Sequence, residues 1–61
     1  MSIYLTTEQV SQYLTVPVGT LYQWRSRGRG PRAAKVGRHL RWKQADVDRW
    51  VDAQATGSEQ R

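Results

Sequence analysis

The stretch LTTEQVSQYLTVPVGTLYQW, residues 5–24, predicts two short helices joined by a tight turn. Thr6 can cap the first helix, and Gln9 has the spacing that completes a capping box. Leu5 can pack on Val10 just inside the helix as a hydrophobic staple. The apolar stripe of this helix consists of Val10, Tyr13 and Leu14. The first helix should therefore end near residue 14 or 15.

The second predicted helix runs from Pro17 to Arg27, because proline suits a first helical turn and Gly28 suits a left-handed stop. Helical periodicity directs Leu21 and Trp24 to the core. The opposite side carries Gly19, Tyr22, Gln23 and Ser26, flanked by Val18, Thr20, Arg25 and Arg27. Such a mixture of hydrogen-bonding side chains and a glycine, with few charges, is typical of a helix that enters the major groove of DNA. Two helices with so short a connection predict a helix-turn-helix.

Residues 33–42 follow a Gly-Pro loop and alternate about a turn at Gly37-Arg38, which predicts a two-stranded hairpin. The side expected to face the core consists of Ala34, Val36, Leu40 and Trp42. The outward side is expected to carry Ala33, Lys35, His39 and Arg41, with Arg38 at the tip. A two-stranded ribbon is marginal alone, so its apolar side should rest on the helices and its basic side should remain free for a partner.

The third predicted helix spans Gln44 to Ala55, with an acidic residue, Asp46, near its N-terminus. Its apolar stripe consists of Val47, Trp50 and Val51. The three tryptophans, Trp24, Trp42 and Trp50, are all in phase with an apolar stripe and are expected in the core. Residues 1–55 are thus predicted to form one α+β domain, a small winged helix-turn-helix with about three helices and a two-stranded hairpin wing. Residues 56–61 have no apolar anchor and are expected to form a flexible tail.

The positive charge is confined to one segment of the chain. The window from Arg25 to Lys43 holds eight of the ten Lys and Arg residues and no acidic residue, so it carries +8 while the whole chain carries +5. A localised basic segment in so small a protein indicates nucleic acid as the partner, because phosphate neutralisation supplies much of such affinity. The alternative is a solvated basic surface that has no partner.

The sequence offers little for catalysis. It contains no cysteine, and its one histidine, His39, lies among cations, so we expect no metal site, cofactor or nucleophile–base pair. Asp48 and Asp52 share a helix face, which is more typical of a solvated acidic surface than of a catalytic pair. The chain is therefore not expected to be an enzyme. Its N-terminus has no signal-peptide pattern and no stretch is long and apolar enough to span a bilayer, which favours a cytoplasmic protein.

Three motifs in this order and spacing resemble the excisionase family, the small relatives of MerR-type DNA-binding domains. The motifs are TLYQW at 20–24, KVGRHLRW at 35–42 and DVDRWV at 46–51. The resemblance covers about residues 4–52 and implies a recognition helix in the major groove, matching Pro17 to Arg27. It also implies a wing in the neighbouring minor groove, matching Lys35 to Arg41. The chain departs from the ligand-sensing MerR regulators because no long dimerisation helix follows the third helix, and from many excisionases at Pro17-Val18-Gly19.

The resemblance implies the function of an excisionase, or recombination directionality factor. Such a protein binds repeated sites near a phage attachment site, bends the DNA and directs a partner integrase toward excision in the bacterial cytoplasm. Two alternatives remain open: a stand-alone transcription regulator of the same fold, and an interaction module whose basic face binds an acidic protein or RNA. Head-to-tail self-association on DNA through the acidic third helix is a further expectation. The residues predicted to bind DNA are Val18, Gly19, Thr20, Tyr22, Gln23, Arg25, Ser26, Arg27, Arg32, Lys35, Arg38, His39 and Arg41.

Overall fold

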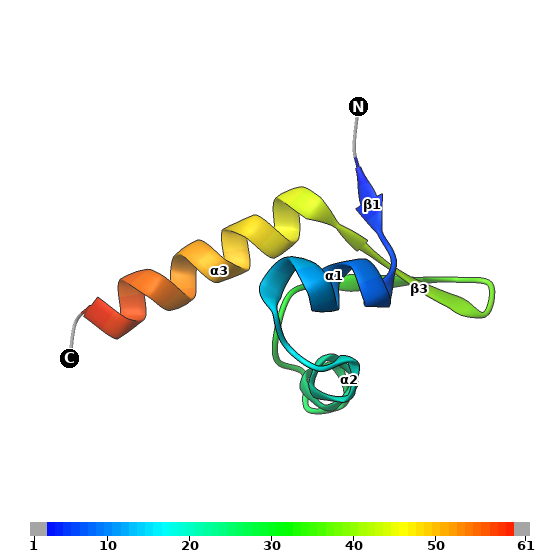
Figure 1. Ribbon diagram of the computed structural model, residues 1–61, viewed down its shortest axis with the longest axis horizontal. Helices are drawn as coiled ribbons and strands as arrows, with labels where there is room; N and C mark the ends of the chain where they lie inside the picture. Colours follow the sequence, from blue (N-terminus) through cyan, green and yellow to red (C-terminus); the bar gives the residue numbers. More distant parts are fainter. Residues whose placement is uncertain (1–2, 60–61) are drawn as a thin grey trace.

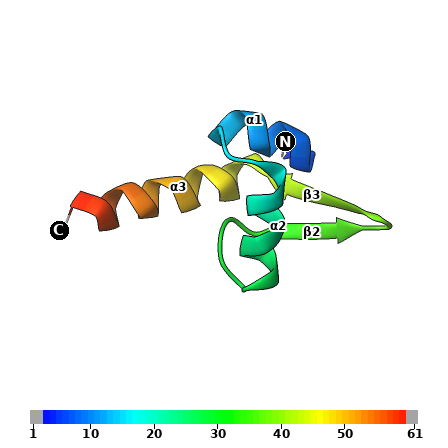
Figure 2. The ribbon, with the colours of Figure 1, turned by 60° about the horizontal axis from the view of Figure 1, so that its bottom comes forward.

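The computed structural model describes residues 3–59, which form three helices and one small sheet (Figure 1). The elements are, in chain order, β1 (Tyr4–Leu5), α1 (Thr7–Leu14), α2 (Val18–Ser26), β2 (Ala33–Val36), β3 (His39–Lys43) and α3 (Gln44–Glu59). The strands are antiparallel in the order β1-β3-β2. The hairpin of β2 and β3 extends from the helical body in one direction and α3 in the other, within extents of 40 × 28 × 20 Å (Figure 2). The predicted α+β winged helix-turn-helix is confirmed.

Helix α1 begins at the predicted capping box. The Thr6 backbone N–H donates to Gln9 Oε1 at 2.8 Å, and the Gln9 backbone N–H donates to Thr6 Oγ1 at 3.0 Å. The helix ends at Leu14, and Thr15 follows in the left-handed region with φ 57°. One part of the prediction is wrong, because the side chain of Tyr13 is 50 % exposed and does not belong to the buried stripe.

Helix α2 follows after a short turn and begins one residue later than predicted. Pro17 has an extended backbone and serves as the N-cap, so Val18 is the first helical residue. The Pro17 carbonyl accepts the Thr20 N–H at 3.0 Å, and no side-chain hydrogen bond caps the helix. At the other end the helix stops at Ser26, and Gly28 has the predicted left-handed conformation with φ +70°.

The sheet has a third strand that the sequence did not indicate. Tyr4 pairs with Lys43 and Leu5 with Trp42, so β1 lies along the free side of β3. A strand of two residues shows no alternation of its own, and its existence depends on β3 being in place beside it. The Gln44 N–H donates to the Ile3 carbonyl at 2.9 Å and extends the same ladder toward α3.

The facing predicted for β2 is wrong. Val36 pairs with His39 across the Gly37-Arg38 turn, and this register places Ala33 and Lys35 on the face of Leu40 and Trp42. Ala33 packs against the core, whereas Ala34 and Val36, predicted to face inward, are exposed. The physical reason is that a two-residue turn fixes the pairing, and in antiparallel strands paired residues share a face. The outward facing of His39 and Arg41 agrees with this register.

The core is small and is centred on one tryptophan. Its fully buried side chains are Val10, Leu21, Trp42 and Val47. Thr7 is also buried, and its hydroxyl accepts a hydrogen bond from Trp42 Nε1 at 3.2 Å, which ties α1 to β3. The other two tryptophans, Trp24 and Trp50, are only partly buried and pack on each other with ring centroids 5.0 Å apart. The buried area is modest, as expected for a domain of this length.

Helix α3 begins directly after β3 and continues to Glu59, past the predicted end at Ala55. The tail predicted for residues 56–61 is thus helical as far as Glu59, and residues 60–61 lie outside the part that the structure describes.

On the acidic side of this helix, Asp48 Oδ1 accepts a hydrogen bond from the Tyr13 hydroxyl at 2.5 Å. The carboxylate raises the pKa of Tyr13 above its usual value, because it stabilises the protonated hydroxyl. No helix within residues 3–59 has the length and apolarity to cross a membrane.

Candidate nucleic-acid interface

The outer side of α2 presents the polar side chains that the sequence predicted there. Leu21 is fully buried, so the opposite residues of this helix turn away from the core. Gly19, Tyr22, Gln23 and Ser26 are exposed, and the Tyr22 side chain keeps 51 % of its surface accessible. Arg25 and Arg27 flank this side and are exposed, while Val18 and Thr20 are half-buried. The exposed side is therefore polar, with hydrogen-bonding groups in the middle and cations at the C-terminal end.

The wing carries its cations around the tip of the hairpin. Lys35, Arg38 and His39 are exposed on β2, the turn and β3. Arg41 is half-buried, and its guanidinium Nη1 donates to the carbonyl of Leu40 at 2.8 Å. Gly37 permits the two-residue turn because its φ of +63° is costly for other residues. The hairpin that carries these basic side chains extends away from the helices (Figure 2).

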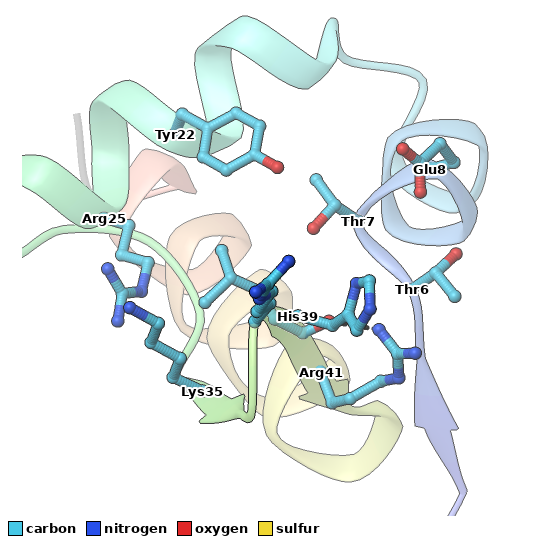
Figure 3. Close-up of a pocket in the computed structure, with 10 residues that line it drawn as sticks. Thr6, Thr7, Glu8, Tyr22, Arg25, Lys35, His39 and Arg41 are labelled. Atoms are coloured by element: carbon cyan, nitrogen blue, oxygen red, sulfur yellow. Dashed lines mark hydrogen bonds between the residues drawn. The ribbon is translucent and has the colours of Figure 1, made fainter.

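A groove of about 410 Å³ connects α2 with the wing. It is lined from α2 by Tyr22 and Arg25, from the wing by Lys35, Arg38, His39, Leu40 and Arg41, and from the start of α1 by Thr6, Thr7 and Glu8. Tyr22 points from α2 toward Thr7. Lys35, His39 and Arg41 line the groove on the side of the wing (Figure 3). Four cations and one carboxylate make the groove strongly basic, which suits a phosphate backbone.

The start of α1 is the part of this groove that the sequence prediction missed. The capping box locates a helix N-terminus, but no local signal shows that Thr6, Thr7 and Glu8 lie beside the wing. The bond from Trp42 Nε1 to the Thr7 hydroxyl brings them there, because Trp42 belongs to β3. Helix N-termini carry a positive dipole end, so α1 adds to the field of the cations, while Glu8 opposes it.

The structure brings together six of the thirteen predicted DNA-binding residues in the groove: Tyr22, Arg25, Lys35, Arg38, His39 and Arg41. Val18, Gly19, Thr20, Gln23, Ser26 and Arg27 belong to α2 or its C-cap and do not line it. Arg32 is separate from both sets, because it precedes β2 and lines another hollow with Tyr4 and Lys43. The candidate interface is therefore the exposed side of α2 together with the groove.

The described part of the chain contains no cluster of three or more His, Cys, Asp or Glu side chains placed to hold a metal ion. The chemistry of the candidate interface is instead that of hydroxyl, amide, imidazole, ammonium and guanidinium donors. These groups bind phosphate oxygens and the acceptor edges of bases.

Comparison with known proteins identifies one family. A family model described as a helix-turn-helix domain matches residues 4–55, which includes every element from β1 to β3 and α3 as far as Ala55. No curated protein and no solved structure matches the chain. The family match covers both helices of the helix-turn-helix and the wing, so it includes every residue of the groove.

Proposed function

This chain belongs to the helix-turn-helix domain family, and from that membership and its basic groove we propose that it is a sequence-specific DNA-binding and DNA-bending protein that acts as an excisionase. The observation that carries the proposal is the groove itself, which joins the polar side of α2 to the cations of the wing. A surface that offers base-reading donors next to phosphate-binding cations suits double-stranded DNA better than an acidic protein.

In this proposal α2 lies in the major groove. Thr20, Tyr22 and Gln23 are the central side chains of the helix and meet base edges or nearby phosphates, and Arg25 and Arg27 neutralise flanking phosphates. A glutamine is well suited to adenine, because its amide both donates and accepts hydrogen bonds. Sequence preference therefore depends chiefly on α2.

The wing enters the neighbouring minor groove in this proposal. Lys35, Arg38, His39 and Arg41 supply cations and an imidazole within the groove that starts at Tyr22. A minor groove held by basic side chains is narrowed and bent at an energetic cost that depends on sequence, so the wing adds shape recognition. The spacing between α2 and the wing is fixed by the protein fold. The DNA bends if this spacing differs from the spacing of the major and minor grooves in a straight duplex.

The excisionase role rests on the motifs at 20–24, 35–42 and 46–51 and not on the fold alone. In this role the protein catalyses nothing. It binds repeated sites near an attachment site in the bacterial cytoplasm and directs an integrase toward excision. A single module of this size buries on the order of 600 to 1,000 Å² on DNA, so several copies are needed for tight and selective binding. Attraction between the acidic third helix, through Asp46, Asp48 and Asp52, and a neighbour's basic surface would support head-to-tail assembly.

The test is a gel-shift titration with DNA from the attachment region of the element that encodes the protein, at two salt concentrations, with and without its integrase. Stepwise cooperative shifts and integrase-dependent excision are expected. Binding that is tight at a promoter and absent at the attachment region would replace the excisionase role with that of a transcription regulator. Absence of DNA binding at low salt would contradict the DNA-binding proposal as a whole.

A further inference from the structure

The sheet has a second face that no helix of the described chain covers. The face toward the helices carries Leu5, Ala33, Leu40 and Trp42, all of which belong to the core or pack against it. Strand alternation places Tyr4, Ala34, Val36, His39, Arg41 and Lys43 on the other side, which we call the outer face. Tyr4 is 55 % exposed and Val36 is 60 % exposed. Large apolar side chains are thus open to solvent at both ends of the outer face.

Cations lie between these apolar side chains. A hollow of about 220 Å³ on the outer face is lined by Tyr4, Arg32, Ala33, Ala34, Arg41, Lys43 and Asp46. Asp46 has Arg49 as an ion partner at 3.9 Å, and neither Arg32 nor Lys43 forms an ion pair within residues 3–59. The hollow therefore has an excess of positive charge that the protein itself leaves uncompensated.

The edge of the sheet beside this hollow is also open. Strand β2 is an outer strand in the order β1-β3-β2, so within residues 3–59 one side of its backbone has no neighbouring strand. Soluble proteins usually protect such edges with charges, and β2 contains one lysine among its four residues, Ala33–Val36. An edge of this kind can accept an added strand, with main-chain hydrogen bonds for affinity and alternate side chains for specificity.

We infer that the outer face binds an acidic, extended segment of a partner protein, which pairs with β2 and places carboxylates on Arg32, Arg41 and Lys43. The charge of the hollow selects an acidic partner. The apolar groups Ala34 and Val36 of β2 favour a peptide over a nucleic acid, because a phosphate backbone has no apolar side chains to place against them. On an added strand, the side chains of this face would lie beside Ala34 and Val36 of β2, and the small side chain of Ala34 lies between them and Arg41 of β3.

The outer face and the DNA groove overlap only in part. Lys35 and Leu40 of the groove belong to the helix-facing side, and Tyr4 and Lys43 belong to the outer face. His39 and Arg41 line the groove but lie on the outer face, so the two surfaces share these residues. Tyr22 and Arg25 of α2 belong to the groove alone, and Arg32 and Lys43 belong to the hollow alone. This inference goes beyond the proposed function and does not depend on it.

The experiment uses the full chain, labelled with ¹⁵N, and a short capped peptide that alternates glutamate and valine. The matched probe alternates lysine and valine. Two variants, Lys43→Glu and Lys35→Glu, change net charge by the same amount on the two sides of the hairpin. We expect amide shifts in β2 and around Lys43 with the acidic peptide only. Lys43→Glu should weaken its binding about five- to tenfold, and Lys35→Glu about twofold or less. Val36→Ser should also weaken it, because Val36 would lie beside the added strand. Circular dichroism should verify that all three variants are folded.

Several outcomes would overturn the inference. They are no binding of the acidic peptide to the unmodified protein, equal losses in the two lysine variants, or shifts centred on α2. Lys43→Glu weakening DNA binding as much as Lys35→Glu would assign the outer face to the DNA interface instead. If the acidic peptide binds as described and DNA does not bind, the outer-face inference stands and the proposed function fails.

Discussion

Replacing Gly30 with alanine should destabilise the fold through two separate effects. Gly30 has φ +81°, and a Cβ added there would lie 2.9 Å from Trp24 Cβ and 3.0 Å from Trp24 Cε3. The left-handed backbone costs about 1 to 2 kcal/mol for a residue with a Cβ. Forcing an extra methyl against a packed side chain adds about 1 to 3 kcal/mol. The sum is about 2 to 5 kcal/mol, against a total stability on the order of 3 to 9 kcal/mol for a chain of this length.

Gly37→Ala is the matched control. Gly37 also has positive φ, +63°, but no atom lies within 4 Å of the position of its Cβ. Its cost is therefore the backbone effect alone, about 1 to 2 kcal/mol. Thermal unfolding followed by circular dichroism should show a Tm about 4 to 16 °C lower for Gly37→Ala, since 1 kcal/mol corresponds to about 4 to 8 °C in small domains. Gly30→Ala should have a lower Tm than this control.

The near-ultraviolet signal separates the two causes. Trp24 packs on Trp50 with ring planes inclined at 44°, and a displaced Trp24 should change the aromatic circular dichroism of the folded state. We expect this change in Gly30→Ala and not in Gly37→Ala. If the two variants lose the same Tm and have identical aromatic spectra, the contact between the new Cβ and Trp24 has no effect. The cost of the left-handed backbone would then explain both losses.

The other predictions concern DNA binding and one titration. Arg38→Ala should weaken binding to all DNA sequences and reduce the slope of log affinity against log salt by about 0.9 per lost phosphate contact, whereas an unchanged slope would remove Arg38 from the interface. Gln23→Ala should chiefly relax sequence preference, measured by competition between specific and random duplexes, at about 1 to 3 kcal/mol. Gly19→Ala should leave Tm unchanged or raise it, because a helical alanine is favoured and no atom lies within 4 Å of the new Cβ. A loss of DNA affinity in this stable variant would show close approach of the α2 backbone to DNA. The hydrogen bond to Asp48 raises the pKa of Tyr13, so the stability from this bond should be present below the usual tyrosine pKa and lost as pH rises through the higher folded value. Ultraviolet titration against Tyr13→Phe measures this, and ionisation of Tyr13 at or below the ordinary value would contradict it.

Local interactions explain why much of the fold could be predicted. The capping box of Thr6 and Gln9, the left-handed stop at Gly28 and the turn at Gly37-Arg38 each depend on residues only a few positions apart. Short-range rules therefore located three helices, the hairpin and the exposed side of α2 within a few residues of their observed bounds. The basic window from Arg25 to Lys43 also supplied the cations of the groove, because four of its eight Lys and Arg residues line it: Arg25, Lys35, Arg38 and Arg41.

Tertiary structure decided the rest, because it depends on contacts between segments distant in the chain. Strand β1 exists only because β3 offers it a partner, and the pairing of Val36 with His39 reversed the facing of β2. The bond between Trp42 and Thr7 brought the start of α1 into the groove. The sequence alone thus determined the local elements and the sign of the surface charge. Packing around Trp42 determined which basic residues share a groove, since burying that one large side chain fixes the helices and the sheet relative to each other.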